Sequence, residues 1–142
     1  MSNYKKPSIT VDIVIFHESF ENKKFILIKR GNNPFKNCWA IPGGFVEYGE
    51  TVENTAIREA KEETGIDIKL KQLFNVYSKP DRDPRGHTVT IVYLATGNTK
   101  AMKADSDAKD VRLCSFDELS SLKIAFDHAK ILTDILEKIN NL

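Results

Sequence analysis

The chain has 142 residues, of which 41% are hydrophobic and 29% charged, and its formal net charge at pH 7 is +1. This length suits one domain with a substantial core and is too short for two ordinary domains, so we expect a single domain over residues 1–142. The near-neutral charge gives no general case for binding nucleic acid or a membrane surface, and no apolar run approaches the roughly 20 residues of a membrane span.

The cysteine usage and the first residues both point to a reducing compartment. Cys38 and Cys114 lie far apart in the sequence and have neither metal-binding nor redox spacing. We interpret both as buried free thiols. Residues 1–7 are polar and basic and lack the apolar stretch of a signal peptide. These features predict a cytoplasmic protein.

Two strands are predicted near the start of the chain. In residues 8–16, aliphatic side chains occupy every second position from Ile9, which predicts a strand with one strongly apolar face. Residues 18–23 form a polar turn. Residues 24–30 are expected to form a second strand that pairs back on the first as a hairpin.

The next stretch contains a loop, a short strand and a sharp turn. Residues 31–34 are the predicted loop and residues 39–41 the short strand, after which Pro-Gly-Gly at 42–44 is expected to turn the chain sharply. Trp39 is expected to pack in the core beside this turn. Base stacking by Phe35 or Trp39 is the alternative.

Residues 51–64 have the composition of a helix without proline, and Gly65 follows as a natural C-cap. At about 100° per residue, five small or apolar side chains fall on one arc roughly 140° wide, which we expect to be the buried face. They are Val52, Ala56, Ile57, Ala60 and Thr64. Glu59, Glu62 and Glu63 occupy an arc of about 100° whose edge adjoins this face.

The three glutamates of this helix are unfavourably placed for a helix alone. Carboxylates at these spacings repel one another, by a few tenths of a kcal/mol per i,i+4 pair. They also lie in the last turn, where the helix dipole favours cations. A solvated acidic face is the ordinary alternative. Because these acids border the buried stripe, a hard cation such as Mg²⁺, which takes oxygen ligands and bridges to phosphates, explains them better.

The segment from Gly44 to Ile66 is similar to the signature of the Nudix hydrolase family, G-x5-E-x7-R-E-U-x-E-E-x-G-U, in which U is apolar. Its seven fixed positions are filled by Gly44, Glu50, Arg58, Glu59, Glu62, Glu63 and Gly65. With residue frequencies near 5–7%, seven such identities arise by chance on the order of once in 10⁸ to 10⁹ windows. The resemblance is therefore specific.

The resemblance implies roles for the matched residues. Glu59, Glu62 and Glu63 are implied to bind a divalent metal, Mg²⁺ or Mn²⁺, and the carbonyl of Gly44 to be a further ligand. Glu50 is implied to pair with Arg58. The implied reaction is attack of water on a pyrophosphate phosphorus in a nucleoside diphosphate linked to another group, with Glu50, Arg58, Glu62 and Glu63 as the catalytic set.

Two further strands and a loop follow the helix. Residues 67–78 predict a strand with a bulge or bend near Gln72, because the alternation is imperfect. Residues 79–86 contain two prolines and a glycine and are expected to be a loop. Residues 87–96 are apolar on both faces, which is typical of a central strand covered on both sides.

The last third is predicted to hold a polar segment (97–110), a strand (111–116), a short helix from Asp117 with Ser115 or Asp117 as N-cap, and a final helix over 124–139. Ala125, Ala129, Leu132, Leu136 and Ile139 form the apolar stripe of the final helix. The elements together predict an α/β fold with helices on both faces of a mixed sheet. This agrees with the α/β/α sandwich that the Nudix resemblance implies.

The loop after the signature resembles the ADP-ribose pyrophosphatase subgroup of this family. Pro80 lies 15 residues after Gly65, and Arg-Asp-Pro-Arg-Gly-His follows at 82–87. Arg82 and Arg85 offer planar charged forks for phosphate or ribose oxygens. Arg30 ends a strand just before the glycine turn and is a further candidate for substrate binding. A solvated loop with Arg82–Asp81 or Arg85–Asp83 ion pairs is the alternative, and a structural role is expected for His87.

Several functional alternatives stay open. The general base is Glu62, Glu63 or an acid of the polar segment, with Asp107 preferred to Asp105. ADP-ribose hydrolysis to AMP and ribose 5-phosphate is the preferred reaction. A nucleoside triphosphate pyrophosphohydrolase and a non-catalytic sensor of ADP-ribose are the alternatives. Relatives that act on ADP-ribose are often homodimers, and the strand at 8–16 could pair at a sheet edge.

Overall fold

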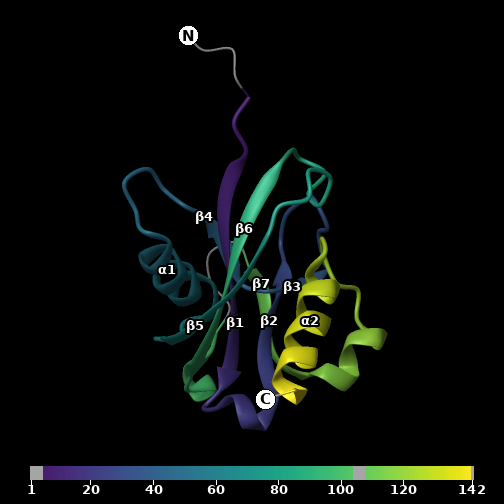
Figure 1. Ribbon diagram of the computed structural model, residues 1–142. Helices are drawn as coiled ribbons and strands as arrows, with labels where there is room; N and C mark the ends of the chain where they lie inside the picture. The colour runs from purple at the N-terminus through teal and green to yellow at the C-terminus, as the bar shows by residue number, and fades with distance from the viewer. Residues whose placement is uncertain (1–4, 104–107, 142) are drawn as a thin grey trace.

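The computed structural model describes residues 5–103 and 108–141. Its strands and helices follow the order predicted from the sequence, with a strand at Gly43–Phe45 and two short 3₁₀ helices, Phe20–Asn22 and Thr99–Ala101, added (Figure 1). In chain order the elements are β1 (Ser8–His17), η1 (Phe20–Asn22), β2 (Lys24–Arg30), β3 (Trp39–Ala40), β4 (Gly43–Phe45), α1 (Val52–Thr64), β5 (Lys69–Tyr77), β6 (Thr88–Gly97), η2 (Thr99–Ala101), β7 (Ala108–Ser115), η3 (Phe116–Ser121) and α2 (His128–Asn140).

The strands form one mixed sheet. The main path runs β3-β2-β1-β6-β5, while β4 pairs with β1 and β7 pairs with β2. β1 and β6 are parallel, in register from Ser8–Thr88 to His17–Gly97, and the other pairs are antiparallel. The predicted hairpin of β1 and β2 is confirmed. The irregularity predicted in β5 is also confirmed, as register shifts at Leu70/Gln72 and Leu73/Asn75.

The two long helices cover opposite faces of the sheet, which confirms the predicted α/β/α sandwich (Figure 1). α1 packs Ala56 and Ala60 against one face, together with Val11, Ile13 and Ile15 of β1. α2 packs on the other face with three fully buried side chains, Ile131, Leu132 and Ile135. Within the described part of the chain, no helix has the length and apolar character needed to cross a membrane.

β1 corrects two expectations. Val14 and Phe16 are as fully buried as Ile13 and Ile15, so the strand is covered on both faces rather than on one. β1 pairs with β2 and β4 along one edge and with β6 along the other, so it lies in the interior of the sheet. β1 therefore cannot serve as the free edge for pairing with a second copy, because its backbone groups are used within the sheet.

The segment predicted as a glycine turn is a strand. Gly43–Phe45 forms β4 and pairs with Thr10, Val11 and Asp12 of β1. A Cβ on Gly43 would overlap the Val11 carbonyl oxygen and the Asp12 carboxylate, so only glycine allows this close approach.

The final helix starts later than predicted, at His128 instead of residue 124. Trp39 forms a parallel bridge with Ile124 and accepts a hydrogen bond from Ala125 N–H at 2.8 Å, which holds this segment against β3. Phe126 then adopts a left-handed backbone with φ of 53°. The shifted start also changes the buried face: His128 is buried and Ala129 is exposed.

Two smaller expectations change, and a third is confirmed. Ile57, predicted on the buried arc of α1, is 45% exposed, and Thr55 and Glu63 are buried instead. Cys114 is a buried free thiol as predicted, but Cys38 is only partly buried. Ser115 is the N-cap of η3, where its backbone N–H donates to Glu118 at 3.3 Å.

Candidate active site

A cleft of about 410 Å³ is lined by residues from β1, β2, the segment joining β3 to β4, α1, the loop before β6, and the start of α2. One side carries Glu59, Glu62 and Glu63 of α1 with Gly43 and Gly44, and we name these five residues the acidic wall. Another side carries Arg30, Arg82 and Arg85, which we name the basic wall. The cleft therefore sets carboxylates and guanidinium groups around one space.

The position of the acidic wall follows from how α1 begins and ends. Thr51 is the N-cap, and its hydroxyl oxygen accepts a hydrogen bond from Asn54 N–H at 3.1 Å. Gly65 ends the helix in a left-handed conformation with φ of 76°, and its N–H donates to the Lys61 carbonyl. With both ends fixed, Glu59 and Glu63 lie one helical turn apart along the cleft.

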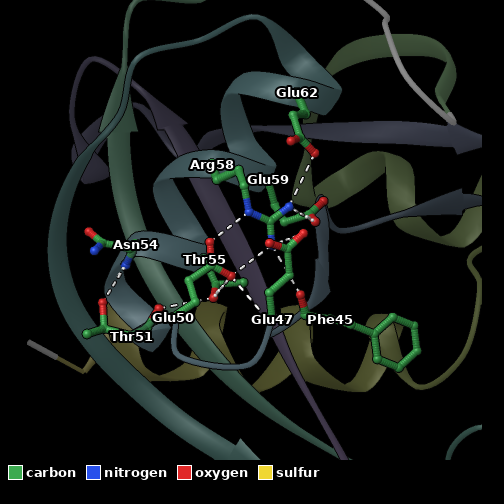
Figure 2. A network of polar contacts seen from close by, with 9 residues as sticks. All are labelled: Phe45, Glu47, Glu50, Thr51, Asn54, Thr55, Arg58, Glu59 and Glu62. Carbon is green, nitrogen blue, oxygen red and sulfur yellow. Dashed lines mark hydrogen bonds and ion pairs between the residues drawn. The ribbon is translucent and has the colours of Figure 1, made fainter.

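Arg58 is the centre of a charged network that ties the acidic wall to the loop before α1 (Figure 2). Its guanidinium makes a bidentate ion pair with Glu50, in which Nε donates at 2.7 Å and Nη2 at 2.9 Å. Nη1 donates to Glu59 at 2.7 Å and to Glu62 at 3.3 Å. Nη2 also reaches the Phe45 carbonyl at 3.2 Å. The pairing of Glu50 with Arg58 implied by the family resemblance is present.

The network changes the acidity of its members. Hydrogen bonds from Arg58 and from the Thr55 hydroxyl lower the pKa of Glu50 to about 2. The hydrogen bond to Glu50 raises the pKa of Arg58 above its ordinary value. Glu50 is thus ionised and Arg58 protonated at any physiological pH, so this ion pair is present throughout the physiological range.

Glu63 is held by the backbone of β4. Gly43 N–H donates to Glu63 Oε1 at 2.8 Å, and the residue is 8% exposed. Burial, with added repulsion from Glu59 and Asp12, raises the pKa of Glu63 to about 8. Burial also raises the pKa of Glu59. A Cβ on Gly44 would overlap the Glu59 carboxylate, so glycine is needed there to admit that side chain.

The donor chemistry of the acidic wall fits a hard divalent cation. Its side chains offer oxygen atoms alone, and burial raises the pKa of both Glu59 and Glu63, so a bound cation would favour their ionised forms. Among the described residues no three His, Cys, Asp or Glu side chains converge closely enough to hold a metal ion. Since Arg58 holds Glu59 and Glu62, these two carboxylates must turn from it to share one ion with Glu63.

The basic wall is built from ion pairs. Arg82 makes a bidentate ion pair with Asp127, in which Nε donates at 2.9 Å and Nη2 at 2.7 Å. The side chain of Arg82 is only 4% exposed. Arg85 makes a bidentate ion pair with Asp83, in which Nε donates at 3.1 Å and Nη2 at 2.8 Å. The predicted alternative of an Arg85–Asp83 pair is therefore present, while the partner of Arg82 is Asp127 and not Asp81. Hydrogen bonds from Arg85 outweigh burial and lower the pKa of Asp83.

Aromatic rings complete the basic wall. The Arg85 guanidinium lies over Phe45 at 5.3 Å and over Phe126 at 5.6 Å from the ring centres. Arg30 lies 5.0 Å from the centre of Phe126 and donates from Nε to the Pro34 carbonyl at 2.7 Å. Phe35 contacts Phe126 at 4.8 Å between ring centres. These contacts fix the orientation of the guanidinium groups.

The other sequence candidates have different placements. Trp39 packs against the core beneath α2, beside the cleft and not in its lining. His87 makes a hydrogen-bonding contact from Nε2 to the Ser78 carbonyl at 2.9 Å, as expected of a structural residue. Asp105 and Asp107, proposed as sources of a general base, lie outside the described residues.

Asp12, Phe126 and His128 are among the cleft-lining residues that sequence reasoning missed. Asp12 and His128 are buried, at 7% and 4% exposure. A signal for Asp12 was present, because it is the one charged residue in the run from Ser8 to Phe16. Phe126 and His128 carried no such signal, since they read as part of a continuous amphipathic helix.

The chain belongs to the Nudix family, because the sequence pattern of the Nudix domain matches residues 6–135. An ADP-ribose pyrophosphatase of Methanocaldococcus jannaschii is 49% identical over 133 residues, which cover 94% of this chain and 75% of that protein. An ADPR responsive transcriptional repressor, NtrR of Acinetobacter baylyi, is 34% identical over 99% of this chain. The chain spans 57% of that repressor's length.

A solved structure shares both fold and sequence with this chain. It is a bifunctional NMN adenylyltransferase/ADP ribose pyrophosphatase from Francisella tularensis, in complex with AMP and a manganese ion. The two superpose with a TM-score of 0.83 at 30% identity, over 96% of this chain and 43% of the other. The fold, the acidic wall and the sequence similarity together define a Nudix hydrolase domain.

Proposed function

We propose that this Nudix hydrolase cleaves the diphosphate of ADP-ribose to give AMP and ribose 5-phosphate. The observation that carries the proposal is the cleft that sets the acidic wall on α1 and the basic wall around one space of about 410 Å³. A diphosphate needs cations along its oxygens, and the nucleoside on one side and the ribose phosphate on the other need polar and aromatic contacts. The relative that is 49% identical carries the name of this activity.

The proposed reaction is hydrolysis at phosphorus. The oxygen of a water molecule bonds to one phosphorus of the diphosphate, the bond from that phosphorus to the bridging oxygen breaks, and the water loses a proton. Glu59, Glu62, Glu63 and the carbonyl of Gly44 would hold a divalent metal, Mg²⁺ or Mn²⁺. When bound, such an ion neutralises charge on the phosphate oxygens and makes a bound water more acidic.

The protein's own side chains have distinct tasks in this proposal. Glu50 fixes Arg58, and Arg58 orients Glu59. Glu62, which is 46% exposed, or Glu63 accepts the proton of the attacking water. Asp107 is the further candidate base named from the sequence. Arg30, Arg82 and Arg85 stabilise the charge of the substrate phosphates, and the pairing of Arg82 with Asp127 keeps the loop before β6 beside the cleft.

The proposal extends to the whole chain. We propose one domain over residues 1–142 that acts in the cytoplasm on a small nucleotide and binds neither nucleic acid nor a membrane. The free thiols Cys38 and Cys114 support a reducing compartment. A homodimer stays a prediction. With β1 in the interior of the sheet, β5 at the end of the strand order is the better edge for pairing.

The test is product analysis in ¹⁸O-water with Mg²⁺, Mn²⁺ or chelator, across ADP-ribose, dGTP, 8-oxo-dGTP and dinucleoside polyphosphates. AMP and ribose 5-phosphate from ADP-ribose, with the label in one of them, support the proposal and identify the phosphorus attacked. Preferred release of pyrophosphate from a triphosphate would replace it with nucleotide-pool cleaning. Binding of ADP-ribose without cleavage in the presence of metal would make the protein a sensor.

A further inference from the structure

His128 joins the start of α2 to the segment that leads into β4. Its ring is buried, with the residue 4% exposed. The backbone N–H of Ile41 donates to His128 Nδ1 at 2.9 Å, although the two residues are 87 positions apart. An N–H donor at Nδ1 requires that this nitrogen carry no proton, so the neutral ring has its proton on Nε2. Burial lowers the pKa of His128, which keeps the ring neutral.

The other ring nitrogen faces Asp12. His128 Nε2 lies 3.7 Å from Asp12 Oδ2, which is too long for a hydrogen bond but close enough for the carboxylate to attract the N–H. The Thr90 hydroxyl donates to the same oxygen at 2.6 Å, and Thr90 is fully buried. Asp12 is thus held by β6, and its carboxylate faces the Nε2–H that the Ile41 contact assigns to His128.

The segment that His128 holds is the one that the acids of α1 use. Two residues after Ile41, Gly43 N–H donates to Glu63 at 2.8 Å. Between them, the Pro42 carbonyl accepts a hydrogen bond from Ile13 N–H at 2.8 Å. At Gly44, the residue after Gly43, there is no room for a Cβ beside the Glu59 carboxylate. A shift of this segment therefore moves the backbone donor of Glu63 and the space for Glu59 together.

We propose that His128 is a positioning residue, oriented by Asp12 and Thr90, which fixes residues 41–44 against the acids of α1 and so sets the geometry for metal binding. The two helices hold the same short segment from the two faces of the sheet, α1 through Glu63 and α2 through His128. The inference rests on the proposed function, because it assigns to these residues the preparation of that site for a divalent metal.

The test measures metal binding without substrate. Mn²⁺ alone is titrated into each variant, and free Mn²⁺ is followed by electron paramagnetic resonance. His128→Ala is expected to weaken Mn²⁺ binding by about 10-fold, as loss of an outer-shell partner does. The same variant should lower kcat for ADP-ribose by about 10- to 100-fold, since small displacements at a reacting centre have effects of this size. His128→Asn, whose amide oxygen can accept the Ile41 N–H, should recover most of both.

Ile135→Ala is the matched control, because Ile135 is fully buried on the same helix two turns further along. It should lower the melting temperature while leaving Mn²⁺ affinity unchanged. Equal Mn²⁺ affinity in His128→Ala and Ile135→Ala would overturn the inference. If His128→Ala does not fold, Thr90→Val, which removes the hydroxyl that donates to Asp12, tests the inference instead. Mn²⁺ binding that is weaker by about 3-fold would support a role through Asp12, and unchanged Mn²⁺ binding would reject it.

The two proposals fail in different ways. A wild-type protein that does not cleave ADP-ribose rejects the proposed function, while the Mn²⁺ titrations still decide the role of His128. A wild-type protein that cleaves ADP-ribose, with Mn²⁺ affinity and kcat unaffected by His128→Ala, keeps the function and rejects the positioning role.

Discussion

The acidic wall comes from one continuous stretch of chain, whereas the basic wall comes from separate stretches. Residues 43–63 supply both glycines and all three glutamates of the former. The latter takes Arg30 from the end of β2 and Arg82 and Arg85 from the loop before β6, and α2 anchors it through Asp127. The first wall depends on local helix geometry, and the second depends on the sheet bringing distant segments together.

The difference also appears in how charge is balanced. Each arginine of the loop has its own carboxylate, Arg82 with Asp127 and Arg85 with Asp83. Beside the acidic wall, Arg58 contacts Glu50, Glu59 and Glu62 at once, and Glu63 accepts a hydrogen bond from the backbone N–H of Gly43. Three carboxylates thus share one guanidinium, and this excess of acidic groups fits a site for a cation.

The largest effect is expected from Glu63→Gln. The amide keeps an oxygen for the Gly43 N–H but loses the charge, so kcat for ADP-ribose with Mg²⁺ should fall by about 10³-fold or more, while the melting temperature is unchanged or higher. Glu137→Gln, an exposed acid on α2, is the control and should retain full activity. Turnover of Glu63→Gln near the wild-type value would remove Glu63 from the metal site.

The contrast between the walls explains what the sequence could predict. The acidic wall was found because its residues follow a fixed spacing within one segment, where helix periodicity alone places side chains. The partner of Arg82 was not found, because Asp127 is 45 positions away and only the packing of α2 brings it near. The start of α2 was misplaced for the same reason: β3 holds residues 124 and 125 in a tertiary contact.

Arg82→Ala tests whether the basic wall is held by its ion pairs. Removing one partner of a largely buried pair leaves Asp127 uncompensated, and we expect a loss of about 3 kcal/mol in the free energy of unfolding. Denaturant unfolding measures it. Arg112→Ala is the control, because the Arg112–Glu118 pair lies at the surface and should contribute less than about 1 kcal/mol. Equal losses in the two variants would mean that Arg82 is not an anchor.

Arg85→Ala should separate binding from turnover. Its guanidinium is 44% exposed and lines the cleft, so the variant should raise KM for ADP-ribose by about 10-fold with kcat within about 3-fold of the wild type. Lys79→Ala removes the same charge from an exposed position of the same loop and should leave KM unchanged. A fall in kcat as large as that of Glu63→Gln would place Arg85 at the reacting phosphorus instead.

A pH titration of the metal-free protein compares two glutamates with opposite shifts. The pKa of Glu63 is raised to about 8 in the folded protein, so the folded state binds the extra proton and stability should fall as pH rises from about 4.5 to 8. The pKa of Glu50 is lowered to about 2, so its contribution is present above pH 4.5 and is lost as pH falls toward 2.

The melting temperature in chelator should therefore fall by a few degrees between pH 5 and 8. Mg²⁺ should oppose this fall because it stabilises the ionised acid. In Glu63→Gln the fall should disappear, whereas in Glu50→Gln it should persist. A melting temperature that does not depend on pH over this range in chelator would show that Glu63 is already ionised without metal.

The smallest effect is expected at Ile57, where the sequence pattern and the structure disagree. Helix periodicity placed it on the buried arc, but the residue is 45% exposed, whereas Ala60 on the same helix is fully buried. Ile57→Lys should change the free energy of unfolding by less than about 0.5 kcal/mol, and Ala60→Leu should reduce it by about 1–3 kcal/mol through overpacking. Denaturant unfolding at two protein concentrations compares them. A loss above about 2 kcal/mol in Ile57→Lys that shrinks on dilution would mean that a second copy covers this face of α1 in solution.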